Sequence, residues 1–412
     1  MQIAGEEIER LRRQIMEQID LTRTVEDEEV YQLIEAQVRD FARERMLTLG
    51  EREAVVQTLF YSLRKLDVLQ ELLEDPAITE IMVNGAEHIF YEKAGRLYKA
   101  EYGFSSKEKL NDVIQQMAGY SNRMVNEASP IVDTRLADGS RVNIVLEPVA
   151  IDGSAVTIRK FPENPIEDLI RMGSISQEAA DLLKILVRCG YNIFISGGTG
   201  SGKTTFLNAL SQYIPREERI ITVEDSAELQ LLDKPNLVRL ETRNANTEGV
   251  TPITIRDLIR TALRMRPERI IVGECRGAEA LDVLQAMNTG HDGSLSTGHA
   301  NSCKDMLSRL ETMVLMGMEL PLSAIRSQIA SGIDILIHLG RLRDKSRKVL
   351  KIVEIAGVEQ GEIELHELFG YEESGEEAQH VRGTLMRTGQ LMHTEKCERA
   401  GMNLEKEGSS GL

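Results

Sequence analysis

The sequence predicts an α/β protein with a parallel-rich sheet, preceded by a helical segment and a small α+β domain. Three observations predict this class. A glycine-rich loop at 197–205 lies between an apolar strand pattern and a helical pattern. Strand and helix patterns then alternate up to about residue 340, as they do when helices connect parallel strands. Before the loop, apolar residues first recur at helical spacing and then fall into short strand patterns.

The composition favours about two to three domains with an aliphatic core. The 412 residues are 42% hydrophobic but only 4% aromatic, with no Trp. No apolar run approaches the length of a membrane span and the N-terminus lacks a signal-peptide pattern, so we expect no direct membrane span. The formal net charge of −17 disfavours a broad cationic surface for nucleic acid. The four cysteines show neither disulfide nor zinc-site spacing, which favours a reduced cytoplasmic protein.

Residues 1–75 are predicted to be a helical segment without a catalytic role, because their apolar positions form stripes among charges. Residues 76–161 are predicted to form a small α+β domain. Its expected elements are strands at 78–85, 88–91, 95–98, 141–146 and 155–159 and a helix that includes 110–117. A proline-containing linker at 161–165 follows, since Pro continues neither a helix nor a strand.

Residues 162–340 are predicted to form the domain that carries the glycine-rich loop. Helices are expected on both faces of a parallel sheet. A small β appendage is expected at 341–400, beginning with the basic turn 341–348, and a disordered tail at 401–412. The expected strands of the sheet are 192–196, 219–224, 237–241, 269–273, 294–298 and 334–338.

The run Gly197–Thr205 matches the phosphate-binding loop pattern G-x-x-x-x-G-K-[ST], in the strand–loop–helix context that the motif requires. Glycines let backbone N–H groups approach phosphates, and the helix N-terminus adds partial positive charge. Lys203 can reach the β- and γ-phosphates, and the Thr204 hydroxyl can bind Mg²⁺. The residues expected to hold ATP and Mg²⁺ are Gly198, Thr199, Gly200, Ser201, Gly202, Lys203, Thr204 and Thr205.

Two strand patterns end in acidic residues. Glu274 follows the 269–273 strand, which we expect to run beside the 192–196 strand, so that Glu274 lies near the γ-phosphate and activates water or binds the metal through water. Glu224 ends the 219–224 strand and is expected to orient Mg²⁺ or the water. Each acid alone is weak evidence, and a plain surface carboxylate after a core strand is the alternative for Glu274.

The glycine-rich run Thr289–Ser302 contains His299 at the end of an expected strand. There His299 can contact a phosphate and convert the nucleotide state into backbone movement. A lone histidine is more often structural, so the weight given to His299 comes from the motifs around it.

In chain order, the phosphate-binding loop, the Glu224-Asp225 strand end, the G-E-x-R-G run at 273–277 and the G-H-D-G-S-x-x-T-x-H-A-N run at 290–301 resemble the secretion (traffic) ATPase superfamily. That superfamily serves type II and type IV secretion, conjugation and type IV pili. The resemblance covers about residues 65–340. Within it, three segments resemble the CpaF-type ATPases of tight-adherence (Flp) pili. These segments are 72–85, 157–161 and 262–267.

The resemblance implies a homo-hexameric ring of RecA-like domains, with an N-terminal domain that swings over each nucleotide. It implies that Lys203 and Thr204 contact phosphate and metal. It also places Glu224 in an acidic box, Glu274 as the catalytic acid and His299 in a histidine box.

The same resemblance implies that Arg135, Arg141 and Arg159 approach the phosphates when the ring closes. An arginine that neutralises the transferring phosphoryl group can raise the rate by about 10³–10⁵. A surface ion pair is the alternative for each of the three.

The sequence therefore predicts an Mg-dependent ATP hydrolase that drives assembly, with or without retraction, of a tight-adherence pilus or a related secretion machine. It is expected in the cytoplasm, peripheral at the inner membrane and docked on an inner-membrane platform protein, with no nucleic-acid partner. The alternatives are a conjugative or type IV secretion ATPase, a RecA- or helicase-like nucleic-acid motor, and a nucleotide-gated scaffold without useful turnover.

Overall fold

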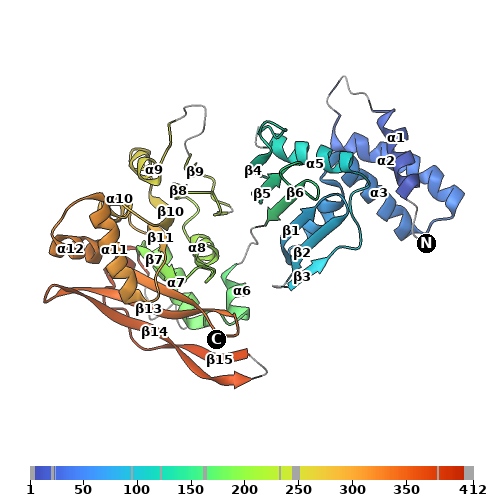
Figure 1. Cartoon of the computed structure of the whole chain (residues 1–412). Helices are drawn as coiled ribbons and strands as arrows, with labels where there is room; N and C mark the ends of the chain where they lie inside the picture. Colours follow the sequence, from blue (N-terminus) through green and yellow to red (C-terminus); the bar gives the residue numbers. More distant parts are fainter. Residues whose placement is uncertain are drawn as a thin grey trace. The chain divides into compact units, whose positions relative to one another are not determined.

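The chain divides into two compact units, Met1–Pro162 and Glu163–Leu412, each with its own sheet and helices (Figure 1). The predicted linker residues 161–164 and most of the predicted tail, 403–412, lie outside the described residues. The computed structural model describes residues 5–19, 23, 25–93, 96–120, 123–160, 165–231, 233–243, 251–377 and 380–402.

The first unit begins with helices that bury their apolar stripes against one another. α3 starts with a capping box, in which Thr48 accepts a bond from the Glu51 N–H and the Glu51 carboxylate accepts one from the Thr48 N–H. Buried residues such as Ile15, Ile34 and Leu59 form a core separate from that of the sheet. The elements are α1 (Gly5–Met16), α2 (Asp27–Arg45), α3 (Leu49–Arg64), η1 (Asp67–Leu69) and α4 (Gln70–Glu74).

The rest of the first unit is an antiparallel sheet of order β3-β2-β1-β6-β5-β4, packed with α5 around one core. The sequence analysis missed β4. It is a short edge strand with only Val132 and Thr134 buried, which gives little periodicity. The elements are β1 (Ile78–Asn84), β2 (His88–Lys93), β3 (Arg96–Lys99), α5 (Lys107–Tyr120), β4 (Ile131–Arg135), β5 (Arg141–Val145) and β6 (Ala155–Arg159).

The second unit is built on a nine-stranded sheet of order β15-β14-β13-β12-β7-β11-β10-β8-β9. Its parallel part confirms the predicted α/β class. The parallel strands are β7 (Ile193–Gly197), β8 (Ile220–Glu224), β9 (Leu237–Glu241), β10 (Arg269–Cys275), β11 (Leu295–Gly298) and β12 (Ile335–Arg341). The antiparallel strands β13 (Arg347–Glu359), β14 (Glu362–Glu377) and β15 (His380–Arg387) lie in the segment predicted as an appendage and continue the same sheet.

One predicted neighbour is wrong. We expected the 269–273 strand beside the strand that precedes the glycine-rich loop, but β11 lies between β7 and β10. β11 is anchored there because Asn192, just before β7, accepts hydrogen bonds from the N–H groups of Gly293 and Ser294, just before β11. The side chains that end β10 therefore reach the loop only across β11.

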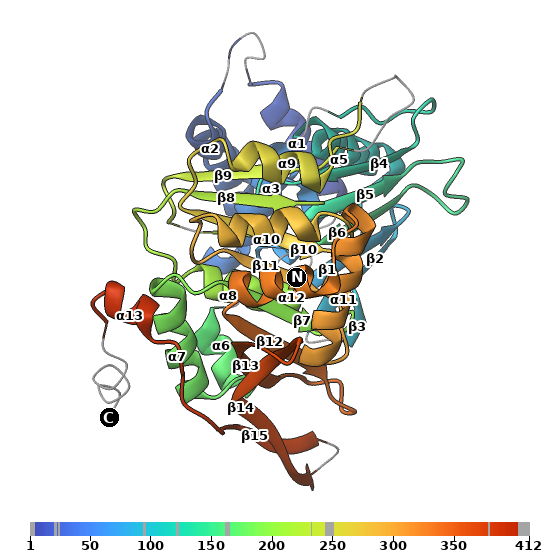
Figure 2. The ribbon, with the colours of Figure 1, turned by 90° about the vertical axis from the view of Figure 1, so that its left-hand side faces the viewer.

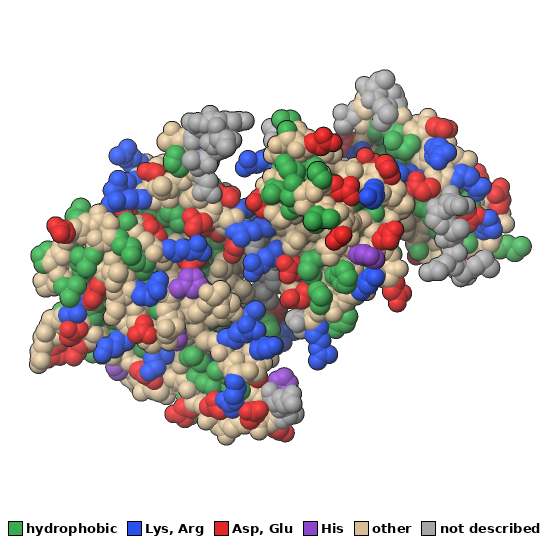
Figure 3. Space-filling model, in the orientation of Figure 1, with side chains coloured by type: hydrophobic (Ala, Val, Ile, Leu, Met, Phe, Trp, Pro, Cys, Tyr) green, Lys and Arg blue, Asp and Glu red, His purple; other side chains and the backbone are tan. Residues whose placement is uncertain are grey.

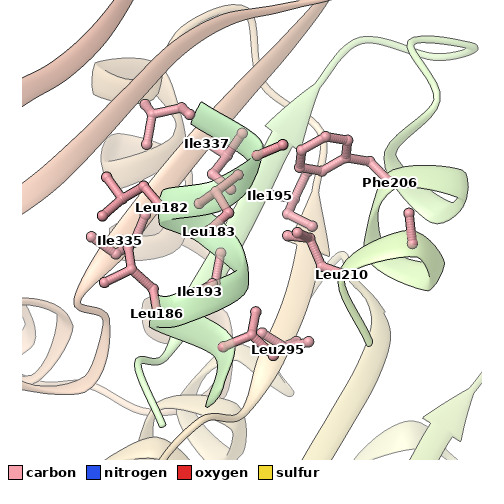
Figure 4. Packing of buried hydrophobic residues seen from close by; sticks show 14 of the residues in the cluster. Leu182, Leu183, Leu186, Ile193, Ile195, Phe206, Leu210, Leu295, Ile335 and Ile337 are labelled. Atoms are coloured by element: carbon pink, nitrogen blue, oxygen red, sulfur yellow. The ribbon is translucent and has the colours of Figure 1, made fainter. Parts of the chain in front are cut away.

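Helices cover both faces of this sheet, and Figure 2 shows α10, α11 and α12 in front of it. Successive residues of β7 serve the two cores, with Ile193 and Ile195 in one and Phe194 in the other. Figure 4 shows Leu183 of α7 and Leu210 of α8 packed toward β7. One face carries α6 (Ile166–Arg171), α7 (Gln177–Arg188) and α8 (Lys203–Ser211), and the other carries α9 (Ile255–Ala262), α10 (Ala280–Asn288), α11 (Cys303–Gly317) and α12 (Leu322–Gly332).

The surface of the second unit is mixed in charge. On the face that Figure 3 shows, Lys and Arg side chains are interspersed with Asp and Glu side chains. In the part of the chain that the structure describes, no helix combines the length and apolar character that crossing a membrane requires.

Asn192 fixes the start of β7 through a buried network. Its side-chain Nδ2 donates to Met287 O at 3.1 Å and to Gly332 O at 2.8 Å, at the ends of α10 and α12. Its Oδ1 accepts the two N–H bonds from the turn before β11, at 2.9 and 3.0 Å. Asn192 is only 1% exposed, so these backbone groups have no access to water if the amide is removed.

We expect Asn192→Ala to lower the free energy of unfolding by at least about 3 kcal/mol, because each buried unsatisfied polar group costs about 1–3 kcal/mol. Urea unfolding followed by circular dichroism checks this. The matched control is Asn288→Ala, because Asn288 is exposed and makes one hydrogen bond, to Gln328 O. Equal midpoints for the two variants would contradict the structural role of Asn192.

Candidate active site

The phosphate-binding loop connects β7 to α8, and its shape requires glycine. Gly200 and Gly202 have φ of +72° and +92°, which side chains disfavour. At Gly197 an added Cβ would lie 2.5 Å from Ser201 Oγ and 2.6 Å from Leu339 O, whereas at Gly198 it would meet nothing within 4 Å. The loop is thus tightly packed at Gly197 and open at Gly198. On the open side a phosphate can approach the backbone N–H groups at the start of α8.

Lys203 is folded back over this loop. Its Nζ donates to Gly197 O at 3.2 Å and to Gly198 O at 3.1 Å, and it lies 3.2 Å from Nδ1 of His299. Lys203 is 8% exposed, and this burial lowers the pKa of its ammonium group, while the nearby Glu274 opposes the shift. The ammonium group is therefore held by acceptors that phosphate oxygens can replace.

His299 connects Lys203 to Glu274. Its Nε2 lies 2.7 Å from Oε1 of Glu274. Because Lys203 has only donors to offer Nδ1, the neutral imidazole carries its hydrogen on Nε2. This nitrogen is close to Oε1 of Glu274, but the contact lacks hydrogen-bond geometry, and Oε1 has no hydrogen-bond partner among the described residues. Burial, together with the charge of Lys203, lowers the pKa of His299 and favours this neutral form. His299 directly follows β11, the strand between β7 and β10. Through His299, Lys203 of the loop and Glu274 of β10 are joined in one chain of contacts.

Arg276 is a member of the site that sequence reasoning missed. Its Nη2 lies 2.5 Å from Oε2 of Glu274, and its Nη1 lies 3.8 Å from Asp225. The Glu274 carboxylate therefore lies between an imidazole and a guanidinium group. The signal was present, since Arg276 is the arginine of the G-E-x-R-G run, but no role had been derived for it.

Glu224 is buried at the end of β8, next to β10. Its Oε2 accepts hydrogen bonds from the N–H groups of Glu228 at 2.7 Å and Leu229 at 3.0 Å. Its Oε1 is buried and has no hydrogen-bond partner among the described residues. Burial raises the pKa of Glu224, and the two N–H bonds oppose the shift. A Cβ at Gly273 would lie 2.9 Å from Glu224 Cγ, so the glycine gives the carboxylate its room.

The available donors fit Mg²⁺, which prefers oxygen ligands and is usually held by one or two carboxylates together with phosphates and waters. Thr204 supplies a hydroxyl in the first turn of α8, and Glu224 supplies the unpartnered carboxylate oxygen. Among the described residues no three His, Cys, Asp or Glu side chains gather as a metal site, so phosphate and water would have to complete the shell. Thr205 follows Thr204 in α8, and Thr199 lies exposed in the loop.

The three predicted arginines lie in the first unit, in one row across its sheet. Arg135 of β4 pairs with Arg141 of β5, and Arg141 pairs with Arg159 of β6. Directly paired residues project from the same face, and like charges in such positions repel each other. The row therefore presents three arginines on one face of the sheet, and Glu80 of β1 stands opposite Arg159 at its end.

The sequence matches the family described as "Type II/IV secretion system protein" over residues 62–406. The chain belongs to this family. The resemblance drawn from the motifs is thus confirmed for the family as a whole, while its CpaF-type branch stays a prediction.

Two relatives of this secretion-system protein are similar over most of their length. A putative conjugal transfer protein of Mycobacterium tuberculosis is 35% identical over 324 residues, which cover 76% of this chain and 91% of that protein. The type IV secretion system protein VirB11 of Brucella suis is 34% identical over 303 residues, 66% of this chain and 84% of VirB11. The crystal structure of the pilus retraction motor PilT with bound ADP shares the fold, with a TM-score of 0.50 at 19% identity over 82% of this chain and 87% of that one.

We expect His299 of this secretion-system protein to titrate below 6.5, its ordinary pKa, because burial and Lys203 both disfavour the imidazolium. The imidazole of His299 binds a proton more readily in the unfolded chain than in the folded protein. Stability is therefore lost as the pH falls from 6.5 through the folded pKa, whereas His299 has no effect on stability above pH 6.5. A histidine NMR titration, with the signal assigned by comparison with His299→Gln, measures this. A pKa at or above the ordinary value would contradict the neutral bridge.

Proposed function

We propose that the chain is an Mg-dependent ATP hydrolase that converts nucleotide turnover into domain movement in a secretion or pilus machine. The observation that supports this most strongly is the contact chain from Lys203 through His299 to Glu274. It joins the cation of a phosphate-binding loop to a carboxylate that can serve as a general base. A scaffold that only bound nucleotide would have no use for this acid.

In the proposed reaction, Lys203 exchanges the carbonyls of Gly197 and Gly198 for β- and γ-phosphate oxygens. Glu274 orients the water that attacks the γ-phosphate and accepts its proton. Thr204 and Glu224 would hold Mg²⁺, and the bound metal would neutralise charge on the phosphates. Once phosphate draws Lys203 away, His299 loses its partner on Nδ1, which lets the loop after β11 report the nucleotide state.

Arg135, Arg141 and Arg159 are proposed to approach the phosphates when the first unit closes over the nucleotide. The strand register supports this, because it places all three arginines on one face of the sheet, where they can act on phosphates together. Closure would then couple the movement of the first unit to hydrolysis. In this proposal 1–75 is a helical segment, 76–161 the arginine-bearing domain, 162–340 the RecA-like ATPase domain and 341–400 an appendage.

We further propose that the chain works as a homo-hexamer in the cytoplasm, peripheral at the inner membrane, on a platform protein of a tight-adherence pilus. The segments 72–85, 157–161 and 262–267 support this branch. No nucleic-acid partner is proposed, in keeping with the net charge of −17.

A conjugative or type IV secretion motor is the second candidate, favoured by the likeness to VirB11 and to the putative conjugal transfer protein. A gene deletion that abolished piliation would support the first, and one that abolished DNA transfer or effector export the second.

We expect Lys203→Ala to abolish Mg·ATP binding or turnover and Glu274→Gln to retain binding while hydrolysis falls about 10²–10⁴-fold, the usual range for loss of a general base. Titration calorimetry and phosphate release measure the two effects separately. The matched control is Glu319→Gln, because Glu319 is exposed and lies in the loop between α11 and α12. Normal turnover in Glu274→Gln would remove Glu274 from the proposed role.

We expect Arg159→Ala to slow hydrolysis by about 10³-fold if Arg159 contacts the transferring phosphoryl group, with ATP affinity nearly unchanged. Arg96→Ala, an exposed arginine of β3 in the same sheet, is the control and should hydrolyse ATP normally. The measurement is phosphate release at saturating ATP. An Arg159 variant with the turnover of the control would show that Arg159 has only a structural role.

A further inference from the structure

The turn between β12 and β13 brings a cation to the phosphate-binding loop from outside the recognised motifs. β12 lies beside β7, with Leu339 opposite Gly197. Nε of Arg347, the first residue of β13, donates to Gly200 O at 3.0 Å. The Arg347 Cδ would lie 3.5 Å from a Cβ at Gly202, so the stem of the side chain runs along the start of α8.

The turn is held in place on both sides of Arg347. Lys348 Nζ donates to Gly173 O at 2.7 Å and to Met172 O at 3.3 Å, at the end of α6. Within the turn, Asp344 accepts a hydrogen bond from the Ser346 N–H at 2.9 Å. The position of Arg347 over the loop is therefore set by backbone and neighbouring contacts.

Arg347 retains most of its donors. A guanidinium group has five N–H donors in a planar fork, and Arg347 uses only its Nε hydrogen. No hydrogen bond or ion pair joins its Nη groups to any residue that the structure describes, and the side chain is exposed. Four donors on a flat cation thus stand next to the loop that would carry the phosphates.

The strand order identifies the end of the nucleotide that Arg347 faces. His299 follows β11 and Glu274 ends β10, so the side chains proposed to act at the γ-phosphate lie on one side of β7. β12 and β13, with Arg347, lie on the other side. A triphosphate that runs from Glu274 back along the loop presents its nucleoside on the β12 side of β7.

We propose that Arg347 binds the nucleoside end of ATP, by hydrogen bonds to the ribose or by stacking of its plane on the base. This inference rests on the proposed function, since it takes 197–205 as the ATP site. A contact with the nucleoside is the same in the ground state and the transition state, so it lowers KM without raising kcat. Arg347 is therefore a binding residue, separate from the hydrolytic group on the other side of β7.

The test compares the affinities of wild-type protein, Arg347→Ala and Arg347→Lys for Mg·ATP, Mg·ADP and inorganic triphosphate. We expect Arg347→Ala to bind both nucleotides about 10- to 150-fold more weakly, the range for loss of a hydrogen bond from a charged group. Inorganic triphosphate, which has no nucleoside, should bind as it does to wild type. KM should rise with kcat unchanged, and Arg347→Lys should restore affinity only partly, because an ammonium group is not planar.

The control is Arg343→Ala, in the same basic turn. Arg343 pairs with Glu373 and Glu376, so its loss should leave all three affinities unchanged. Unchanged nucleotide affinity in Arg347→Ala would overturn the assignment. An equal loss for inorganic triphosphate would also overturn it, because Arg347 would then act through the shape of the loop. If wild-type protein bound none of the three ligands, the proposed function would fall together with this assignment.

Discussion

The site depends on a buried ammonium group that has lost most of its water. Lys203 is 8% exposed, and its charge is offset by two loop carbonyls and an imidazole nitrogen. Burial of a charge is costly unless such partners are close, so the cation constrains everything around it. The carbonyls of Gly197 and Gly198 must point toward the ammonium group, and the imidazole is held in its neutral form. The same arrangement keeps the lysine available for an anion, because each partner is one that a phosphate oxygen can replace.

The rigidity of this arrangement comes from the position of β7 in the sheet. The strand has β12 and β11 on its two sides and a hydrophobic core on each face, so the loop starts from a fixed point. Asn192 fixes the other end of the strand by bonding to the segment before β11 and to the last turns of α10 and α12. Packing and hydrogen bonding thus fix the five residues of β7. The space beside Gly198 stays open to a ligand.

Much of this could be predicted from the sequence. Fully buried strands such as β7 and β8 are continuous apolar runs, and the glycine-rich loop between β7 and α8 has its own pattern. The order of the strands could not be predicted, because it depends on contacts such as that between Asn192 and Gly293, 101 residues apart. Arg347 was missed for a related reason. Its partner Gly200 is 147 residues away, and a basic turn between strands carries no local sign of what it contacts.

The same limit applies to the arginines of the first unit. Arg135, Arg141 and Arg159 were each named from a family resemblance, but the row that they form depends on the register of β4, β5 and β6. A shift of one residue in either pairing would send alternate side chains to opposite faces. Sequence patterns identify residue types well, whereas the alignment of three strands is a property of the folded sheet.

Strands β13 to β15 extend the sheet beyond β12, and each strand pairs with the next one apart from local shifts in register. Nine strands paired in this way resist shear, and the glycine-rich loop follows β7, the central strand of the sheet. A load applied to these outer strands would therefore reach the glycine-rich loop through the sheet. By thermodynamic reciprocity, a ligand of the loop whose affinity depended on that load would bias the binding of a partner at the outer strands to the same extent.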